Sequence, residues 1–371
     1  MSSSIPSTTR ALVVRSKGEI VLEQAVPTPK LRDDYLLVRT TAVALNPTDW
    51  KTADFLIGGD PSGTRVGCDY AGVVVAVGSK VTQPFKVGDR IAGGAHGSNQ
   101  VQKEDGAFAD YIAAKPDLAF KIPDFMSDED AASLPLGTTT VGQGFYQGLK
   151  LATPENPLKT PENILIYGGA TATGILGIQF AKLSGYRVLV TASPKNAEYL
   201  KSLGADEVID YHDTDAALAN IKTALNGGAL RYAWDCISYV ETAQFCAKAL
   251  ALTPASLAEG PGSLQYYQLL FNPFEPLKEI DPRIDGGMTL YYTAFGEYFE
   301  KWMPFEASST DLQFARQFWE STRKLINDGK LKPARTYVNR GGADLEGVLV
   351  GLKELKGDKV SGGKLVYTIK Q

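Results

Sequence analysis

The feature that most restricts the fold of this chain is a short apolar segment followed by a glycine-rich turn and a helix-forming segment. Asn163–Tyr167 (NILIY) has the length and apolar character of a strand buried on both faces. The turn at 168–177 (GGATATGILG) follows, and apolar residues then recur at helical spacing up to Gly185. Small residues let the backbone approach a pyrophosphate, and a helix N-terminus offers it unpaired N–H groups. The pattern predicts dinucleotide binding; a helix packed closely on a strand, without a ligand, is the alternative.

The same strand–helix alternation continues after this turn. Strands are expected at 187–191 (RVLVT), 207–210 and 232–237, with helices of ten to fifteen residues between them. Ser193-Pro194 is expected to begin one of these helices, as N-cap and first-turn proline, and Gly204 to end it. Such alternation predicts a parallel, doubly wound Rossmann sheet of the α/β class.

The first part of the chain has a different pattern, that of a β-rich domain with tight glycine turns. Strands are expected at Tyr35–Leu45, Asp69–Gly78 and Asp89–Ala92. A helix is expected at Asp128–Leu134, with Ser127 as its N-cap. The stretch 252–290 is interrupted by prolines and is left unassigned.

The last part of the chain is expected to return to the first domain. It is predicted to form helices at 311–328 and 345–356 and a strand at 364–369. The predicted division is a β-rich domain at 1–127 and 297–371 and a Rossmann domain at 128–296.

The residues after the second Rossmann strand bear on the choice of cofactor. An NAD site usually carries an acid there, which binds the ribose 2′-hydroxyl. The segment 191–196 (TASPKN) has no acid. Ser193 and Asn196 can hydrogen-bond a 2′-phosphate, Lys195 can neutralise it, and Tyr211 can pack on the adenine. The segment favours NADPH; a capping serine beside a solvated lysine is the alternative.

Cysteine and histidine are scarce in this chain. It has three cysteines, at 68, 236 and 246, and two histidines, at 96 and 212, with no CxxC or HxxxH pair. Zinc sites need three or four such ligands, so we expect no zinc and interpret the cysteines as core residues. Neither histidine is expected to be catalytic.

The charge and hydropathy of the chain exclude other classes of function. The net charge is −4 without a basic block, which gives no reason to expect nucleic acid or an anionic membrane. Apolar runs are too short to span a bilayer. Met1–Arg10 is polar and is expected to be a disordered leader, and a cytoplasmic location is expected by default.

Several motifs resemble those of the medium-chain dehydrogenase/reductase superfamily. They are Ala44–Asp49 (ALNPTD), Gly67–Gly72 (GCDYAG), the turn at 86–91 and Leu134–Thr140. Asn46 and Cys68 stand where the zinc enzymes of that superfamily carry a cysteine and a histidine ligand, and the lobe of structural cysteines is missing. The resemblance therefore implies a zinc-free member, and it implies that the β-rich domain at 1–127 and 297–371 is a GroES-like substrate domain.

A narrower resemblance is to the fungal trans-acting enoyl reductases of polyketide biosynthesis. It rests on short ordered matches in both domains: ALNPTDWK at 44–51, YGGATAT at 167–173, SPKN at 193–196, YAWDCI at 232–237 and FGE at 295–297. It implies hydride transfer from NADPH to Cβ of an α,β-unsaturated thioester on the carrier protein of a polyketide synthase, or of a synthase fused to a peptide synthetase.

The resemblance also implies which residues form the site. The expected cofactor residues are Asn46, Thr48, Asp49, Trp50, Lys51, Ala170, Thr171, Ala172, Thr173, Ser193, Pro194, Lys195, Asn196, Tyr211, Phe271, Asn272, Val360 and Ser361. The expected acyl-pocket residues are Thr140, Val141, Gly142, Gln143, Gly144, Phe145, Tyr146, Gln147, Tyr292, Thr293, Ala294, Phe295 and Gly296.

Reduction without a metal needs hydrogen-bond donors at the developing enolate oxygen and a proton for Cα. Lys51 and Thr140 are the catalytic candidates; a surface lysine and an ordinary helix residue are the alternatives. Asp49 is expected to be structural, because a carboxylate would destabilise an enolate. The dense aromatic residues between Tyr266 and Trp302 are expected mainly to pack the core, and some could line an acyl pocket.

Two other functions remain open from the sequence. One is a stand-alone quinone or enone reductase, and the other is an NADPH-binding regulatory protein with little catalysis. Prolines between 252 and 290 are expected to disrupt an edge strand, which favours a monomer.

The candidates for docking an acidic carrier protein are four cations, Lys51, Arg65, Lys359 and Lys364.

Overall fold

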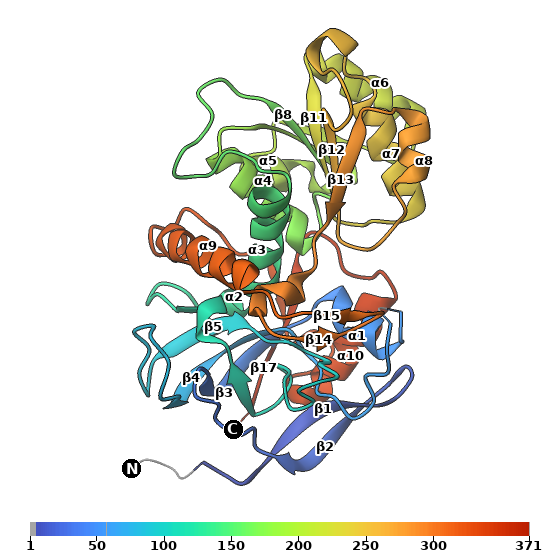
Figure 1. The fold of residues 1–371 in the computed structure, drawn as a ribbon. Helices are drawn as coiled ribbons and strands as arrows, with labels where there is room; N and C mark the ends of the chain where they lie inside the picture. Colours follow the sequence, from blue (N-terminus) through green and yellow to red (C-terminus); the bar gives the residue numbers. More distant parts are fainter. Residues whose placement is uncertain (1–4, 57, 371) are drawn as a thin grey trace. The chain divides into compact units, whose positions relative to one another are not determined.

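The computed structural model describes residues 5–56 and 58–370, which fall into two compact units. Unit 1 comprises Met1–Thr139 and Tyr292–Gln371, and unit 2 comprises Thr140–Tyr291. Figure 1 shows the helices and strands of both units. No helix of the described residues has the length and apolar character needed to cross a membrane.

Unit 2 contains the predicted parallel sheet. Its six strands lie in the order β10-β9-β8-β11-β12-β13, and every neighbouring pair is parallel. The strands are β8 (Asn163–Tyr167), β9 (Arg187–Thr191), β10 (Glu207–Ile209), β11 (Leu230–Asp235), β12 (Leu264–Gln268) and β13 (Ile284–Met288). The helices are α4 (Ala172–Leu183), α5 (Ala197–Ser202), α6 (Thr214–Leu225), α7 (Val240–Leu250) and α8 (Glu275–Ile280).

Side-chain alternation along β8 explains why this strand is wholly apolar. Leu165 belongs to the core cluster formed with α6, α7 and α8, whereas Ile166 faces Gly177 of α4. In Figure 1, α4 lies on one side of β8 and β11, and α6 and α7 lie on the other. A Cβ at Gly177 would lie 2.7 Å from the Trp234 ring, so this glycine permits the close packing of α4 on the sheet. Both faces of the strand are covered, as its composition predicts.

The stretch that the sequence left unassigned completes the sheet. β12 and β13 both form within 252–290, and β13 is the edge strand. The prolines at 254, 261, 273, 276 and 282 all fall between the strands. The expectation that they disrupt the edge strand is therefore wrong. The prolines give no reason to expect a monomer.

Unit 1 is built around a second, mostly antiparallel sheet in the order β16-β17-β3-β4-β5-β7, with β6 paired to β3. Its strands are β3 (Leu36–Ala44), β4 (Asp69–Val77), β5 (Arg90–Gly94), β6 (Tyr111–Ala114), β7 (Ala119–Lys121), β16 (Thr336–Val338) and β17 (Lys364–Thr368). Two hairpins lie beside it: β1 (Thr8–Ser16) with β2 (Glu19–Pro27), and β14 (Phe299–Glu300) with β15 (Pro304–Phe305). The helices are α1 (Pro47–Ala53), α2 (Asp128–Ala132), α9 (Ser309–Asn327) and α10 (Asp344–Lys356). α3 (Pro135–Gly142) crosses from this unit into unit 2.

The C-terminal strand returns to the first domain, as expected. β17 pairs antiparallel with β3, with Val366 opposite Ala44. β1 already begins at Thr8, so Thr8–Arg10 are not part of a disordered leader. Residues 1–4 of that expected leader lie outside the described residues.

Candidate functional site

The turn between β8 and α4 is compact because of its small residues. Gly168 has φ +80°, a region that favours glycine, and a Cβ at Gly174 would lie 2.4 Å from the Gly168 carbonyl oxygen. The Thr171 hydroxyl is the N-cap of α4: it accepts from the Gly174 amide at 2.9 Å and donates to the Gly168 carbonyl at 2.8 Å. The half-buried Ala172 and Thr173 form the first turn of this twelve-residue helix. This is the backbone arrangement that a pyrophosphate requires.

The segment after β9 also has the features of a phosphate site. Pro194–Asn196 forms a short 3-10 turn, and the six-residue helix α5 begins only at Ala197. Ser193 precedes the turn but makes no side-chain capping hydrogen bond, so its side chain does not act as the expected N-cap. Lys195 is exposed, and none of the carboxylates that the structure describes lies within 4.0 Å of it. A serine hydroxyl and a lysine ammonium that are not engaged in capping or ion pairing are suited to an anion.

The neighbouring strands bring further expected residues to the same edge, because parallel strands end on one side of their sheet. Tyr211 follows β10, is 39% exposed, and stacks on the His212 ring at 4.6 Å. Asn272 follows β12, and its side-chain amide donates to the Ser238 carbonyl at 2.7 Å. Phe271 beside it is 68% exposed. An exposed aromatic ring at each of two strand ends could stack on the rings of a dinucleotide.

In unit 1, the residues before and within α1 form a buried polar corner. Asn46 is the N-cap, and its backbone N–H donates to the Asp49 carboxylate at 2.7 Å. The Asn46 side-chain amide donates to Asp69 at 2.8 Å, and the Lys364 ammonium also bonds Asp69. Burial raises the pKa of Asp49 to about 7. These contacts agree with a structural role for Asp49; contact of Asn46 with a cofactor stays a prediction.

The remaining expected cofactor residues of unit 1 lie near the end of α10. Lys51 is half-buried; burial lowers its pKa, and Asp358 partly opposes that shift. Lys356 forms an ion pair with Asp54 at 2.6 Å, which joins α1 to α10. Lys51 therefore lies in the electrostatic range of the turn that precedes Val360 and Ser361. The catalytic role of Lys51 stays a prediction.

A buried cluster around Tyr292 contains residues that sequence reasoning dismissed or missed. The Tyr292 hydroxyl is 2.7 Å from the Thr48 hydroxyl, and its ring stacks on His96 at 4.5 Å. The Lys301 ammonium lies 4.3 Å from the centre of the Tyr292 ring and donates to the Ser98 carbonyl at 3.2 Å. Burial lowers the pKa of Lys301 to about 8 and holds that of His96 well below its usual value. Residues with strongly shifted pKa values gather at functional sites. No local sequence motif indicated that Lys301 and His96 belong to such a cluster.

The positions that correspond to zinc ligands do not form a ligand set. Cys68 is buried, and burial raises the pKa of its thiol, while Asn46 is engaged by Asp69. Within residues 5–56 and 58–370, no group of three or more His, Cys, Asp or Glu side chains is arranged to hold a metal ion.

The first expected acyl segment, Thr140–Gln147, begins in the last turn of α3 and continues into a single turn of π-helix, Gln143–Gly148. Phe145 is fully buried with its ring 4.8 Å from Trp234, and the Tyr146 hydroxyl bonds Ser184 at 2.8 Å. Thr140, the other catalytic candidate, is 5% exposed. Phe145 thus anchors this segment to β11 of the sheet, and Tyr146 anchors it to the end of α4.

The second acyl segment, Tyr292–Gly296, lies mostly in the 3-10 turn η5 (Tyr291–Phe295) of unit 1. The predicted aromatic residues are divided between the units, and half of them are buried, whereas Phe271, Tyr298 and Trp302 are exposed.

Two of the expected docking cations are not on the surface. Arg65 is 4% exposed and donates to the Pro27 carbonyl, and Lys364 is 2% exposed and bonds Asp69. The expectation that they dock a carrier protein is wrong, because both side chains are buried. No local signal in the sequence indicated the partners that bury them. Lys359 is exposed.

Comparison with known proteins agrees with this architecture. Residues 32–124 match the alcohol dehydrogenase GroES-like domain, and residues 172–254 match the zinc-binding dehydrogenase family. The chain is 42% identical over 374 residues to the trans-enoyl reductase resD of Aspergillus sclerotiorum, which covers 97% of this chain and 100% of that relative. It is 46% identical over 291 residues to the trans-enoyl reductase TOXD of Cochliobolus carbonum, covering 78% and 92%.

The fold is shared with more distant enzymes. The crystal structure of CurK enoyl reductase matches with a TM-score of 0.72 at 20% identity, covering 98% of this chain and 100% of that one. The expected resemblance is confirmed: the chain belongs to the trans-enoyl reductases, within the medium-chain dehydrogenase/reductase superfamily.

Proposed function

We propose that this protein is an NADPH-dependent enoyl reductase that acts in trans on a polyketide thioester. Its substrate is an α,β-unsaturated acyl group on the carrier protein of a polyketide synthase, or of a synthase fused to a peptide synthetase. The observation that carries the proposal is its near full-length similarity to trans-enoyl reductases, combined with a glycine turn at the end of β8 that is suited to a pyrophosphate.

The choice of NADPH is supported by the end of β9. Ser193 and Lys195 offer a hydroxyl and an ammonium there, and no acid in 191–196 would repel a 2′-phosphate. The exposed Tyr211 ring at the end of β10 could pack on the adenine. When bound, the cofactor supplies the hydride.

The protein residues have the tasks of positioning and of charge stabilisation. Addition of hydride at Cβ places negative charge on the thioester oxygen, and Cα then takes a proton. We assign Lys51 and Thr140 to donate hydrogen bonds at this stage. Burial lowers the pKa of the Lys51 ammonium. Lys51 can therefore release a proton more readily than an exposed lysine. Tyr292–Gly296 and Thr140–Gln147 would line the acyl pocket.

The test measures NADPH consumption with the same enoyl group on carrier protein, on pantetheine and on coenzyme A, and in parallel with simple quinones. We expect turnover of the thioesters, with the carrier-bound form preferred at low salt. Turnover of quinones alone would identify a stand-alone quinone reductase. Tight NADPH binding with no turnover of any acceptor would identify a regulatory protein.

A further inference from the structure

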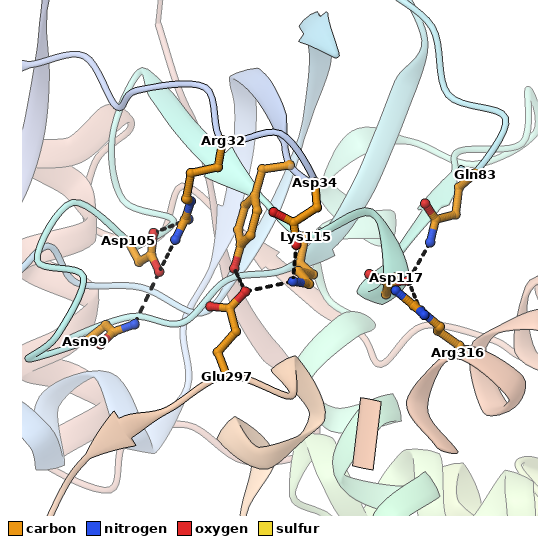
Figure 2. Close-up of polar contacts among 10 residues, drawn as sticks. Arg32, Asp34, Gln83, Asn99, Asp105, Lys115, Asp117, Glu297 and Arg316 are labelled. Carbon is orange, nitrogen blue, oxygen red and sulfur yellow. Dashed lines mark hydrogen bonds and ion pairs between the residues drawn. The ribbon is translucent and has the colours of Figure 1, made fainter. Parts of the chain in front are cut away.

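The chain re-enters unit 1 through η5, and the carboxylate that follows is held by buried groups. One oxygen of Glu297 accepts from the Tyr35 hydroxyl at 2.6 Å and from the Lys115 ammonium at 2.7 Å (Figure 2). The Lys115 side chain is 4% exposed and that of Glu297 is 28% exposed. A charge-assisted contact with so little access to water is stronger than a surface ion pair.

The partners of Glu297 are themselves fixed. Lys115 also bonds Asp34 at 2.8 Å, and the Arg32 guanidinium lies 3.5 Å above the Tyr35 ring while pairing with Asp105 at 2.6 Å (Figure 2). Burial works against the charge on Lys115, but its carboxylate partners outweigh this and raise its pKa above the usual value. The ammonium therefore stays charged at neutral pH.

The same place in the fold also anchors α9. Lys115 leads into the 3-10 turn η1 (Pro116–Leu118), where Asp117 pairs with Arg316 of α9 at 2.5 Å. Gly296 has φ +70°, and a Cβ there would lie 2.6 Å from Cβ of Leu312. The backbone next to Glu297 is thus confined between α9 and the Lys115–Tyr35 pair.

The other end of η5 is attached to the expected cofactor segment. Tyr292 bonds Thr48 through its hydroxyl at 2.7 Å, and the Phe295 ring lies 5.3 Å from the His96 ring. The five residues Tyr292–Gly296 are therefore held at Thr48 on one side and at Glu297 on the other. Loss of the second attachment would free this segment while leaving the first in place.

We propose that Glu297 is a positioning residue for acyl selection: Lys115 and Tyr35 fix its carboxylate, and it thereby holds Tyr292–Gly296 against the acyl chain. This inference rests on the proposed function, because it takes this segment as part of the acyl pocket. Glu297 itself is assigned no proton transfer.

The test compares Glu297→Ala and Glu297→Gln with Glu300→Ala. Glu300 is a matched control, because it is exposed, lies three residues further on, and bonds the Tyr298 hydroxyl at 2.7 Å. The measurements are hydrogen exchange of the 291–296 amides, the urea unfolding midpoint, NADPH affinity, and kcat and KM for crotonyl- and decenoyl-pantetheine. A merely structural carboxylate would lower the unfolding midpoint without moving the ratio of the two substrates.

We expect Glu297→Ala to speed exchange at 291–296 and to change the substrate ratio by roughly fivefold, mainly through KM, with NADPH affinity nearly unchanged. Glu297→Gln keeps an acceptor for Tyr35 and Lys115 and should lie between Ala and wild type. Glu300→Ala should match wild type. If hydrogen exchange of the 291–296 amides is unchanged in Glu297→Ala, Glu297 does not anchor this segment. If exchange is faster but the ratio of kcat/KM for the two thioesters is unchanged, Glu297 has no role in acyl selection. Absence of wild-type turnover of any thioester overturns the proposed function itself, and the exchange result distinguishes that outcome from failure of the anchor.

Discussion

Replacing Lys364 by methionine tests whether the polar corner behind α1 is held by its buried charge pair. The ammonium bonds Asp69 and also donates to the Ser133 carbonyl at 3.2 Å, and the two charged side chains are 2% and 0% exposed. Removal of one partner of a buried pair typically costs about 3–5 kcal/mol, because the other charge stays buried. Asp69 would keep two donors, the Asn46 amide at 2.8 Å and the Leu136 N–H at 2.7 Å. We therefore expect the lower end, roughly 3 kcal/mol.

The matched control for this substitution is Lys182→Met. Lys182 pairs with Asp206 at 2.7 Å, a similar geometry, but the two side chains are 46% and 32% exposed. Pairs in contact with water contribute about 0–1 kcal/mol. Urea unfolding should be monitored through the hydrogen exchange of amides in β3, β4 and β17, because these strands report on unit 1 and not on unit 2. If Lys364→Met costs no more than Lys182→Met, the argument from burial is refuted.

Three further outcomes can be measured on the same protein. Lys195→Ala should weaken NADPH about tenfold, or on the order of 1–2 kcal/mol, and leave NADH unchanged; equal losses would place the 2′-phosphate elsewhere. Elemental analysis should find no stoichiometric zinc, and chelators should leave activity intact. The pKa of Lys301 is lowered to about 8 from 10.5, so between these values the unfolded chain binds a proton that the folded chain lacks. Wild type should therefore gain stability relative to Lys301→Met as pH rises from about 8 towards 10.5, measured by urea midpoints.

Local patterns predicted the elements whose signals are contiguous in sequence. The apolar run of β8, the glycine turn and the helix after it were all predictable, because strand burial and helix capping depend on neighbouring residues. β12 and β13 were missed because prolines surround them without entering them. A count of prolines over a forty-residue window cannot distinguish a disrupted strand from a strand with proline-rich connections.

The site residues that sequence reasoning missed depend on contacts between distant parts of the chain. His96 and Lys301 meet the predicted pocket residue Tyr292 only after folding, and neither of the two lies in a motif. Lys364 and Arg65 were interpreted as surface cations because charged residues are mostly exposed. Their buried partners, Asp69 and the Pro27 carbonyl, lie far away in sequence.

Each unit builds its share of the proposed site from internal contacts. In unit 2, the small residues of the glycine turn and the Thr171 cap determine where a pyrophosphate could meet α4. In unit 1, Asp69 fixes the N-cap of α1, and Glu297 fixes the far end of η5. Because these anchors are separate hydrogen-bond networks, their substitutions should act on different quantities: cofactor affinity for the turn, stability for the corner at Asp69, and acyl preference for Glu297. If the anchors are independent, the free-energy changes of such variants should add when the variants are combined. Strong coupling between the changes at Asp69 and Glu297 would mean that unit 1 responds as one network.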